Sequence, residues 1–88
     1  MMVRVNGSLL RFTDYRRVIN VAAPTVEAAL TKLAEEYEAL RPVLFDRLGR
    51  IRPANRVMLN GELLDTDKLA RSAGDADSVE LLLAISGG

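Results

Sequence analysis

The chain has 88 residues, with 12 basic and 12 acidic side chains that leave no net charge, and it contains neither cysteine nor histidine. The balanced charge removes the usual electrostatic argument for binding nucleic acid or an anionic membrane. The missing residue types exclude disulfides, Cys/His metal sites, and Ser-His-Asp or Cys-His catalysis. The length predicts a single domain, residues 1–88. With no signal-like or membrane-length apolar run, we expect a cytoplasmic protein.

The first twenty residues predict two strands. Val3 and Val5 flank a polar residue, and this alternation is typical of a half-buried strand. Asn6-Gly7 is a turn signal. A polar stretch then leads into a second strand at residues 18–21. Two such strands with a short link predict a hairpin.

Residues 25–40 predict one amphipathic helix. Thr25 is a suitable N-cap, and Pro42 is placed to end the helix. Spacings of four and three residues put the apolar side chains on one face. These side chains are Val26, Leu30, Leu33, Tyr37 and Leu40.

The segment at residues 43–54 is less regular. Val43, Leu44 and Leu48 fit a short helical turn that ends at Gly49. This is also the basic part of the chain, through Arg47, Arg50, Arg52 and Arg56. The arginines fit either a docking surface for an acidic partner or, as is more common for a charge run, a solvated loop.

Two shorter strands are expected next, at residues 56–59 and 62–64. Asn60-Gly61 between them is a strong signal for a tight hairpin. A turn or short helix follows at residues 65–67, with Leu69 beneath it.

Residues 79–85 predict the last strand. Alternate side chains, from Val79 to Ile85, share one face. Leu82 lies on the other face, where it either meets a partner or packs under residues 43–54. The element order predicts an α+β roll, a mixed sheet with one main helix packed on one face, in which the first and last strands are adjacent, parallel and central. The predicted core consists of Val3, Val5, Ile19, Val26, Leu30, Leu33, Val57, Leu59, Leu69, Val79, Leu81 and Leu83.

Few side chains offer a chemical site. The acidic pairs Asp65/Asp67 and Asp75/Asp77 lack the glycine and distant glutamate of a calcium loop. We therefore interpret them as turn and cap residues, and expect no metal site. The sequence also has no glycine-rich phosphate-binding motif.

The remaining feature is Gly87-Gly88, which comes directly after the last predicted strand. A diglycine has no Cβ atoms, so it passes through a narrow channel into another protein's active site. Its free carboxylate can be activated without any side-chain chemistry. An extended tail at residues 84–88 reaches roughly 16 Å, at about 3.3 Å per residue. Ile85, Ser86 and Gly87 lead to Gly88 in this tail.

Three internal motifs accompany the diglycine. They are T-V-x-x-x-L at residues 25–30, N-G-x-x-L at residues 60–64 and G-D-x-D-x-V at residues 74–79. With them the sequence resembles the ubiquitin-like, β-grasp sulfur carriers: the small subunit of molybdopterin synthase, the thiamin sulfur carrier and the carrier of an alternative cysteine pathway. The resemblance covers essentially the whole chain, and the diglycine after a strand is its most specific element.

The resemblance implies a carrier that is not itself an enzyme and has no catalytic residues. A ubiquitin-activating-type partner would use ATP and magnesium to adenylate the Gly88 carboxylate, while this chain would bind no cofactor. A persulfide or other sulfur donor would displace AMP and leave a thiocarboxylate, and an acceptor biosynthetic enzyme would receive the sulfur. Neither nucleic acid nor a membrane is expected as a partner. The expected partner contacts are Leu82, Arg47, Arg50 and Arg52.

Two departures from the family pattern bear on the pathway. Residues 83–86 lack the paired prolines of molybdopterin-type carriers, and residues 43–56 are longer than expected for a thiamin-type carrier. Both favour a cysteine or specialised-metabolite pathway. The main alternative is a ubiquitin-like modifier that forms an isopeptide bond through Gly88. A plain interaction domain with an incidental diglycine is a third hypothesis, and an internal active site has little support.

Overall fold

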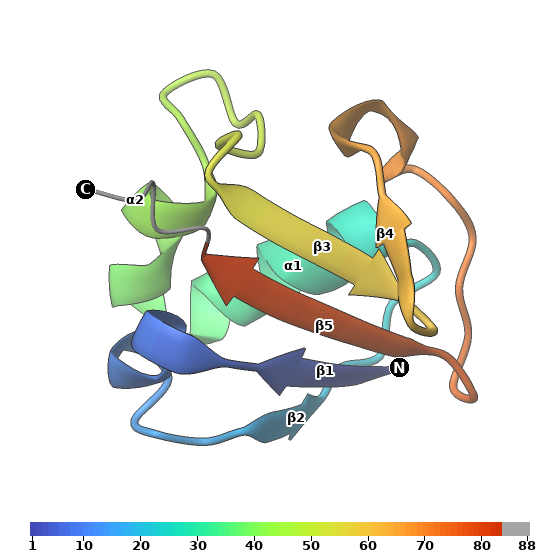
Figure 1. Ribbon diagram of the computed structural model, residues 1–88, viewed down its shortest axis with the longest axis horizontal. Coiled ribbons are helices and arrows are strands. Elements are labelled where there is room, and N and C mark those ends of the chain that lie inside the picture. Colours follow the sequence, from blue (N-terminus) through green and yellow to red (C-terminus); the bar gives the residue numbers. More distant parts are fainter. Residues whose placement is uncertain (84–88) are drawn as a thin grey trace.

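A computed structural model describes residues 1–83, which form a five-stranded mixed sheet covered by helices (Figure 1). The strands are β1 (Met2–Val5), β2 (Val18–Asn20), β3 (Asn55–Leu59), β4 (Glu62–Leu64) and β5 (Ser78–Leu83). The helices are α1 (Val26–Glu36) and α2 (Arg41–Leu44), with short 3-10 helices η1 (Gly7–Phe12), η2 (Glu38–Leu40) and η3 (Thr66–Lys68). The predicted α+β, β-grasp arrangement is confirmed.

The sheet is built around its first and last strands. Its order is β2-β1-β5-β3-β4, and β1 runs parallel to β5 while every other neighbouring pair is antiparallel. The register pairs Val3 with Val79 and Val5 with Leu81, and all four side chains are buried. Each of the two strands has a hydrogen-bonded neighbour on both sides, so neither is an edge strand. The predicted parallel central pair is therefore confirmed.

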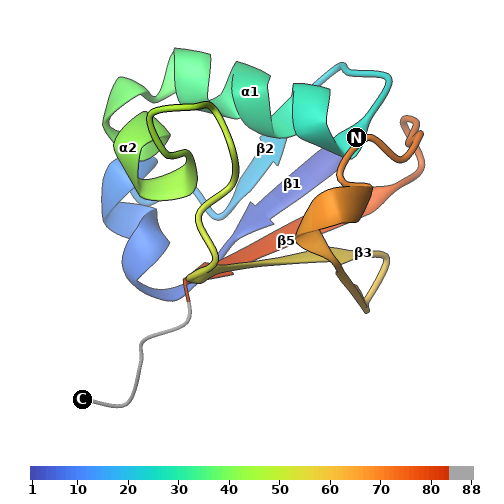
Figure 2. The same cartoon turned by 90° about the horizontal axis from the view of Figure 1, so that it is seen from above.

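Helix α1 crosses one face of this sheet (Figure 2). The predicted N-cap is confirmed, because Thr25 Oγ1 accepts a hydrogen bond of 3.1 Å from the backbone N–H of Ala28. The helix is shorter than predicted. Tyr37 leaves the helical conformation, and η2 and α2 follow. Pro42 lies in the first turn of α2, where its missing N–H is not needed. The prediction that this proline ends the long helix was wrong.

The link between β1 and β2 also differs from a short hairpin turn. The two strands do pair, but η1 lies between them and buries Leu9 completely. Buried Thr13 then closes the link, since its Oγ1 lies 3.3 Å from the carbonyl oxygen of Leu10 and 3.0 Å from that of Arg16. Apolar alternation does not report such a compact link, because it is neither strand nor α-helix.

The predicted core is confirmed except at Leu83, which is only half-buried. The predicted hairpin at Asn60-Gly61 is also confirmed, since both residues have positive φ, as a type I′ turn requires. Predicted Leu69 lies buried after η3. Within residues 1–83, no helix combines the length and the apolar composition needed to cross a bilayer.

Candidate functional site

The candidate site is the end of the sheet at which β5 stops. Leu83, the last described residue, pairs with Asn55, and Leu82 pairs with Arg56. Strand β5 pairs with β1 as far as Leu81 and with β3 as far as Leu83, so β3 alone holds its last two residues. The predicted site residues Ile85, Ser86, Gly87 and Gly88 lie outside the described residues.

Leu82 lies on the face of the sheet opposite α1. Its neighbours along β5, Leu81 and Leu83, point toward the core side, and successive side chains in a strand alternate. Leu82 is half-buried and lies beside exposed Arg56 of β3. That Leu82 contacts a partner stays a prediction.

The same open face carries a row of side chains across all five strands. The register joins Val18 to Arg4, Arg4 to Glu80, Glu80 to Met58, and Met58 to Leu63. Apolar side chains thus border a central pair of opposite charges. This composition suits a protein partner better than a polyanion, because the charges cancel and the flanks are apolar.

Asn55 is a site residue that the sequence analysis missed. It is 2% exposed, and its Nδ2 donates to the carbonyl oxygens of Val43 (2.9 Å) and Arg52 (3.3 Å). Its backbone N–H also donates to the Arg52 carbonyl oxygen at 3.0 Å. Asn55 therefore joins α2 and the following loop to the start of β3, directly opposite Leu83. A lone asparagine before a strand carries no sequence signal for this role.

Residues 46–53 form an ordered loop, called here the arginine loop. The Oδ1 atom of Asp46 accepts hydrogen bonds from the backbone N–H groups of Leu48 and Arg50, each at 2.9 Å. Its Oδ2 atom accepts from Arg50 Nε at 3.2 Å. These contacts, above all the backbone N–H of Arg50, lower the pKa of Asp46. The carboxylate thus holds the turn in place.

The expected helical turn ending at Gly49 was wrong in its extent. Helix α2 ends at Leu44, and Leu48 lies at the exposed tip of the arginine loop, 76% accessible. Gly49 has a φ of 79°, a left-handed conformation that belongs to the loop. The apolar pattern gave a wrong prediction because Leu48 is left mostly exposed and does not join the core.

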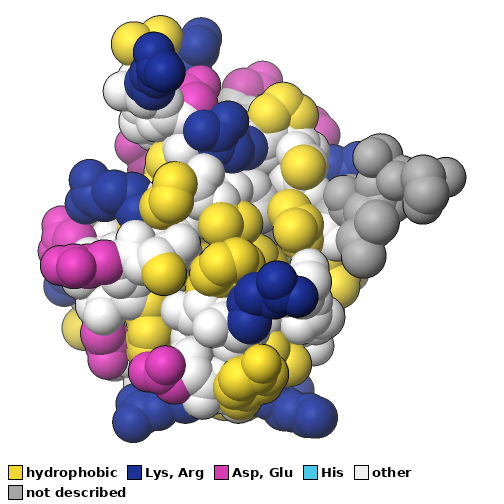
Figure 3. Space-filling model, turned by 90° about the vertical axis from the view of Figure 1, so that its left-hand side faces the viewer, with side chains coloured by type: hydrophobic (Ala, Val, Ile, Leu, Met, Phe, Trp, Pro, Cys, Tyr) yellow, Lys and Arg dark blue, Asp and Glu magenta, His cyan; other side chains and the backbone are white. Residues whose placement is uncertain are grey.

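Three predicted contact residues, Arg47, Arg50 and Arg52, lie in this loop and are exposed. The Nε of Arg52 donates to the Pro42 carbonyl oxygen at 2.7 Å, which fixes the base of the loop. Figure 1 shows the loop rising where β3 begins and β5 ends. In Figure 3, which faces this end of the molecule, hydrophobic side chains gather near the middle with Lys and Arg side chains around them. The structure therefore places the arginines and Leu82 at the same end of the sheet.

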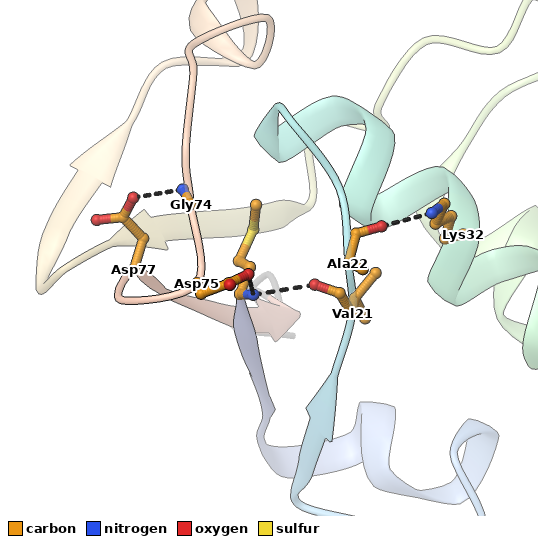
Figure 4. Close-up of polar contacts among 7 residues, drawn as sticks. Val21, Ala22, Lys32, Gly74, Asp75 and Asp77 are labelled. Atoms are coloured by element: carbon orange, nitrogen blue, oxygen red, sulfur yellow. Dashed lines mark hydrogen bonds and ion pairs between the residues drawn. The ribbon is translucent and has the colours of Figure 1, made fainter.

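The acidic pair Asp75/Asp77 lies at the opposite end, where β5 begins. Asp77 Oδ2 accepts from the backbone N–H of Gly74 at 2.7 Å (Figure 4), and its Oδ1 accepts from Asn60 Nδ2 at 2.9 Å. The Asn60 contact, followed by that of Gly74, lowers the pKa of Asp77. Asp75 is exposed and lies 3.9 Å from the Met1 ammonium group. The prediction of a turn role is confirmed for Asp77, which joins the β3–β4 turn to β5.

The mixed sheet with its central parallel pair and crossing helix defines a ubiquitin-like, β-grasp protein. The sequence pattern of the ThiS family matches residues 3–88. The chain belongs to the ThiS family. A search among curated proteins found no match.

Solved structures agree with this assignment. SAMP1 from Haloferax volcanii is 25% identical over 99% of this chain and 97% of its own, with a TM-score of 0.82. A chain in the BexX/CysO complex of Amycolatopsis orientalis is 18% identical over 99% of this chain and 98% of its own, also with a TM-score of 0.82. CysO from Mycobacterium tuberculosis is 23% identical over 96% of this chain and 98% of its own, with a TM-score of 0.81. The neighbours are similar in fold over nearly their whole length.

Proposed function

We propose that this chain is a sulfur carrier whose Gly88 carboxylate is adenylated and converted to a thiocarboxylate. One observation carries the proposal: the ThiS family match runs from residue 3 to residue 88 and so includes the diglycine. The carrier is not an enzyme, and ATP and magnesium belong to the adenylating partner.

The chemistry takes place at one carbonyl carbon. A carboxylate oxygen of Gly88 attacks the α-phosphorus of ATP, and pyrophosphate leaves. The resulting acyl-adenylate has AMP as a good leaving group, which a bare carboxylate lacks. Sulfide then displaces AMP to give the thiocarboxylate directly, whereas a persulfide gives an acyl disulfide that a thiol must reduce.

The described residues supply the platform for this chemistry. The pairing of Leu83 with Asn55 of β3 fixes the end of β5, so the proposed tail starts from a defined point. The partner contacts proposed on this platform are Leu82 on the open sheet face and the arginine loop, since both lie where β5 ends.

The acceptor is proposed to belong to a cysteine or specialised-metabolite pathway. The sequence lacks paired prolines at residues 83–86, and residues 43–56 are long. A neighbour of the same fold is solved in the BexX/CysO complex, which supports a protein partner for a carrier of this shape.

A second candidate function is a ubiquitin-like modifier that forms an isopeptide bond with a target lysine. It is favoured by the similarity to SAMP1 of Haloferax volcanii, a small archaeal modifier protein. Both functions start from the same acyl-adenylate, so the fold alone does not separate them.

Intact mass spectrometry tests the proposal. The chain is incubated with the ubiquitin-activating-type enzyme of the same organism, ATP, magnesium and sulfide. A carrier gains about 16 Da at its C-terminus, because one oxygen becomes sulfur. A modifier instead yields covalent adducts on lysines of added cell extract. A chain lacking Gly88 is the control, and if it gains the same mass the proposal is refuted.

A further inference from the structure

The charge of this chain is unevenly distributed, although its net charge is zero. Residues 39–61 contain five arginines and one aspartate, which gives this segment a net charge of +4 and leaves −4 on the remainder. Among residues 1–83, Arg50 pairs with Asp46, while the other four arginines of the segment form no ion pair. Those four are Arg41, Arg47, Arg52 and Arg56. Unpaired guanidinium groups at one end of a neutral protein are available to carboxylates of a partner.

The arginine loop presents part of this charge in a fixed shape. Besides the carboxylate contacts of Asp46, its backbone closes through Asp46 N–H to the Arg50 carbonyl (2.8 Å) and Gly49 N–H to the Asp46 carbonyl (3.0 Å). Phe45 and Ile51 form a bridge below the turn, and Arg52 N–H donates to the Leu44 carbonyl at 2.7 Å. A loop ordered before binding loses little conformational entropy when a partner docks.

The tip of this fixed loop is apolar. Leu48 is the most exposed large hydrophobic side chain among residues 1–83, and it follows exposed Arg47 directly in the sequence. A leucine held mostly in solvent on an ordered turn contributes little apolar burial to the isolated chain. An aliphatic tip beside cations fits an apolar socket with a carboxylate rim, and it does not fit a nucleic acid, which is contacted by cations and aromatic stacking.

We propose that the arginine loop docks on the adenylating enzyme, with Leu48 in an apolar socket and Arg47 against acidic side chains at its rim. This inference rests on the proposed function, because it takes the adenylating enzyme as the partner that both candidate functions share. The position of the loop supports that partner: Asn55 and Arg56, just after the loop, pair with Leu83 and Leu82. A protein that receives the chain beyond Leu83 therefore lies within reach of the loop.

Binding without ATP tests this surface separately from catalysis. The dissociation constant of the adenylating enzyme of the same organism is measured by calorimetry with wild type, Leu48→Ser and Arg47→Glu. Leu48→Ser should weaken binding by about tenfold or more, because a buried leucine contributes about 1.5–3 kcal/mol. Arg47→Glu should weaken it by about five- to tenfold at low salt, and this loss should shrink at high salt.

Matched variants control for fold and for nonspecific charge. Leu48→Met keeps an apolar tip and should bind like wild type, as should Arg47→Lys, which keeps the charge. Arg71→Glu makes the same charge change on an exposed arginine before β5 begins and should also bind like wild type. Because Arg47 and Leu48 are both exposed, the variants at these two positions should keep the wild-type melting temperature.

The outcomes separate this proposal from the proposed function. Unchanged affinity of both Leu48→Ser and Arg47→Glu, or no binding by the wild type, overturns the docking surface. The docking surface is also overturned if the wild type binds a labelled DNA duplex and Arg47→Glu abolishes that binding while it keeps its affinity for the enzyme. If the loop variants lose binding but wild type gains neither sulfur nor conjugates, the docking surface stands and the proposed function fails.

Discussion

Replacing Asn55 is the sharpest way to test how the base of the arginine loop is held. Its Nδ2 donates to two carbonyl oxygens at 2.9 and 3.3 Å while the side chain is buried. Asn55→Ala leaves the Val43 carbonyl oxygen without this donor, while the Arg52 carbonyl oxygen keeps the backbone N–H of residue 55. An unsatisfied buried polar group costs about 1–3 kcal/mol, so we expect a loss of that size in the free energy of unfolding.

Asn55→Asp provides the more demanding comparison, since it keeps the shape and replaces the amide donor with an oxygen. At neutral pH the introduced carboxylate would face the carbonyl oxygens of Val43 and Arg52, and an uncompensated buried charge costs about 3–5 kcal/mol. Burial should raise the pKa of the introduced carboxyl group. A protonated carboxyl can donate again, so the deficit relative to wild type should shrink as the pH falls.

The assay is urea unfolding followed by circular dichroism, at neutral pH and at mildly acidic pH. The expected order of stability at neutral pH is wild type, then Asn55→Ala, then Asn55→Asp. Equal stability of wild type and Asn55→Asp at neutral pH would refute the reasoning, because it would mean that the two carbonyl contacts are not made.

Three further predictions follow from other parts of the molecule. Leu30→Ala, at a fully buried position, should lower the free energy of unfolding by about 2–5 kcal/mol. Leu63→Ala, at a position 63% exposed, should change it by less than about 0.5 kcal/mol. Equal losses for the two variants in urea unfolding would show that the buried face of α1 is assigned wrongly. The lowered pKa of Asp77 means that its contribution to stability is complete above its ordinary pKa of 3.8 and is lost as the pH falls below that value. Asp77→Asn should therefore show a smaller acid-induced drop in melting temperature than wild type, and an identical drop would contradict this. Deleting Gly88 should abolish ATP–pyrophosphate exchange with the adenylating enzyme and leave the melting temperature unchanged. Gly87→Ala should slow the exchange. If the chain that lacks Gly88 exchanges at the wild-type rate, both the carrier function and the modifier function are rejected.

The sheet could be predicted from the sequence because the buried side chains of its central strands stand at alternate positions. Val3, Val5, Val79 and Leu81 identify both central strands, and the turn at Asn60-Gly61 fixes the second hairpin. Thr25 marks the start of α1 by its side-chain chemistry. In each case a local pattern and the tertiary packing require the same conformation.

In the parts that were mispredicted, the local sequence pattern does not determine the conformation that the tertiary packing selects. Pro42 suits both the end of one helix and the first turn of another, and the packing of buried Leu40 and Leu44 selects the second. Leu48 was read as part of a helical turn although it is exposed. The contacts of Asn55 join segments that are twelve residues apart, so no local pattern reveals them. The tail from Ile85 to Gly88 stays a prediction.

The position of β5 in the sheet couples the tail to the stability of the whole fold. Without β5, the β1–β2 and β3–β4 hairpins share no ladder, because β5 lies between them. Leu82 and Leu83 pair with β3 alone, whereas Leu81 pairs with both β1 and β3, so pulling Leu81 out of register would begin to divide the sheet in two. Such an opening costs far more than fraying of the last two residues and approaches the free energy of global unfolding. A partner can therefore draw out Leu82 and Leu83 at little cost, whereas Leu81 is held from both sides. A partner with a deeper active site has to bind with its surface closer to the sheet, since removing more of β5 from the sheet would unfold the carrier.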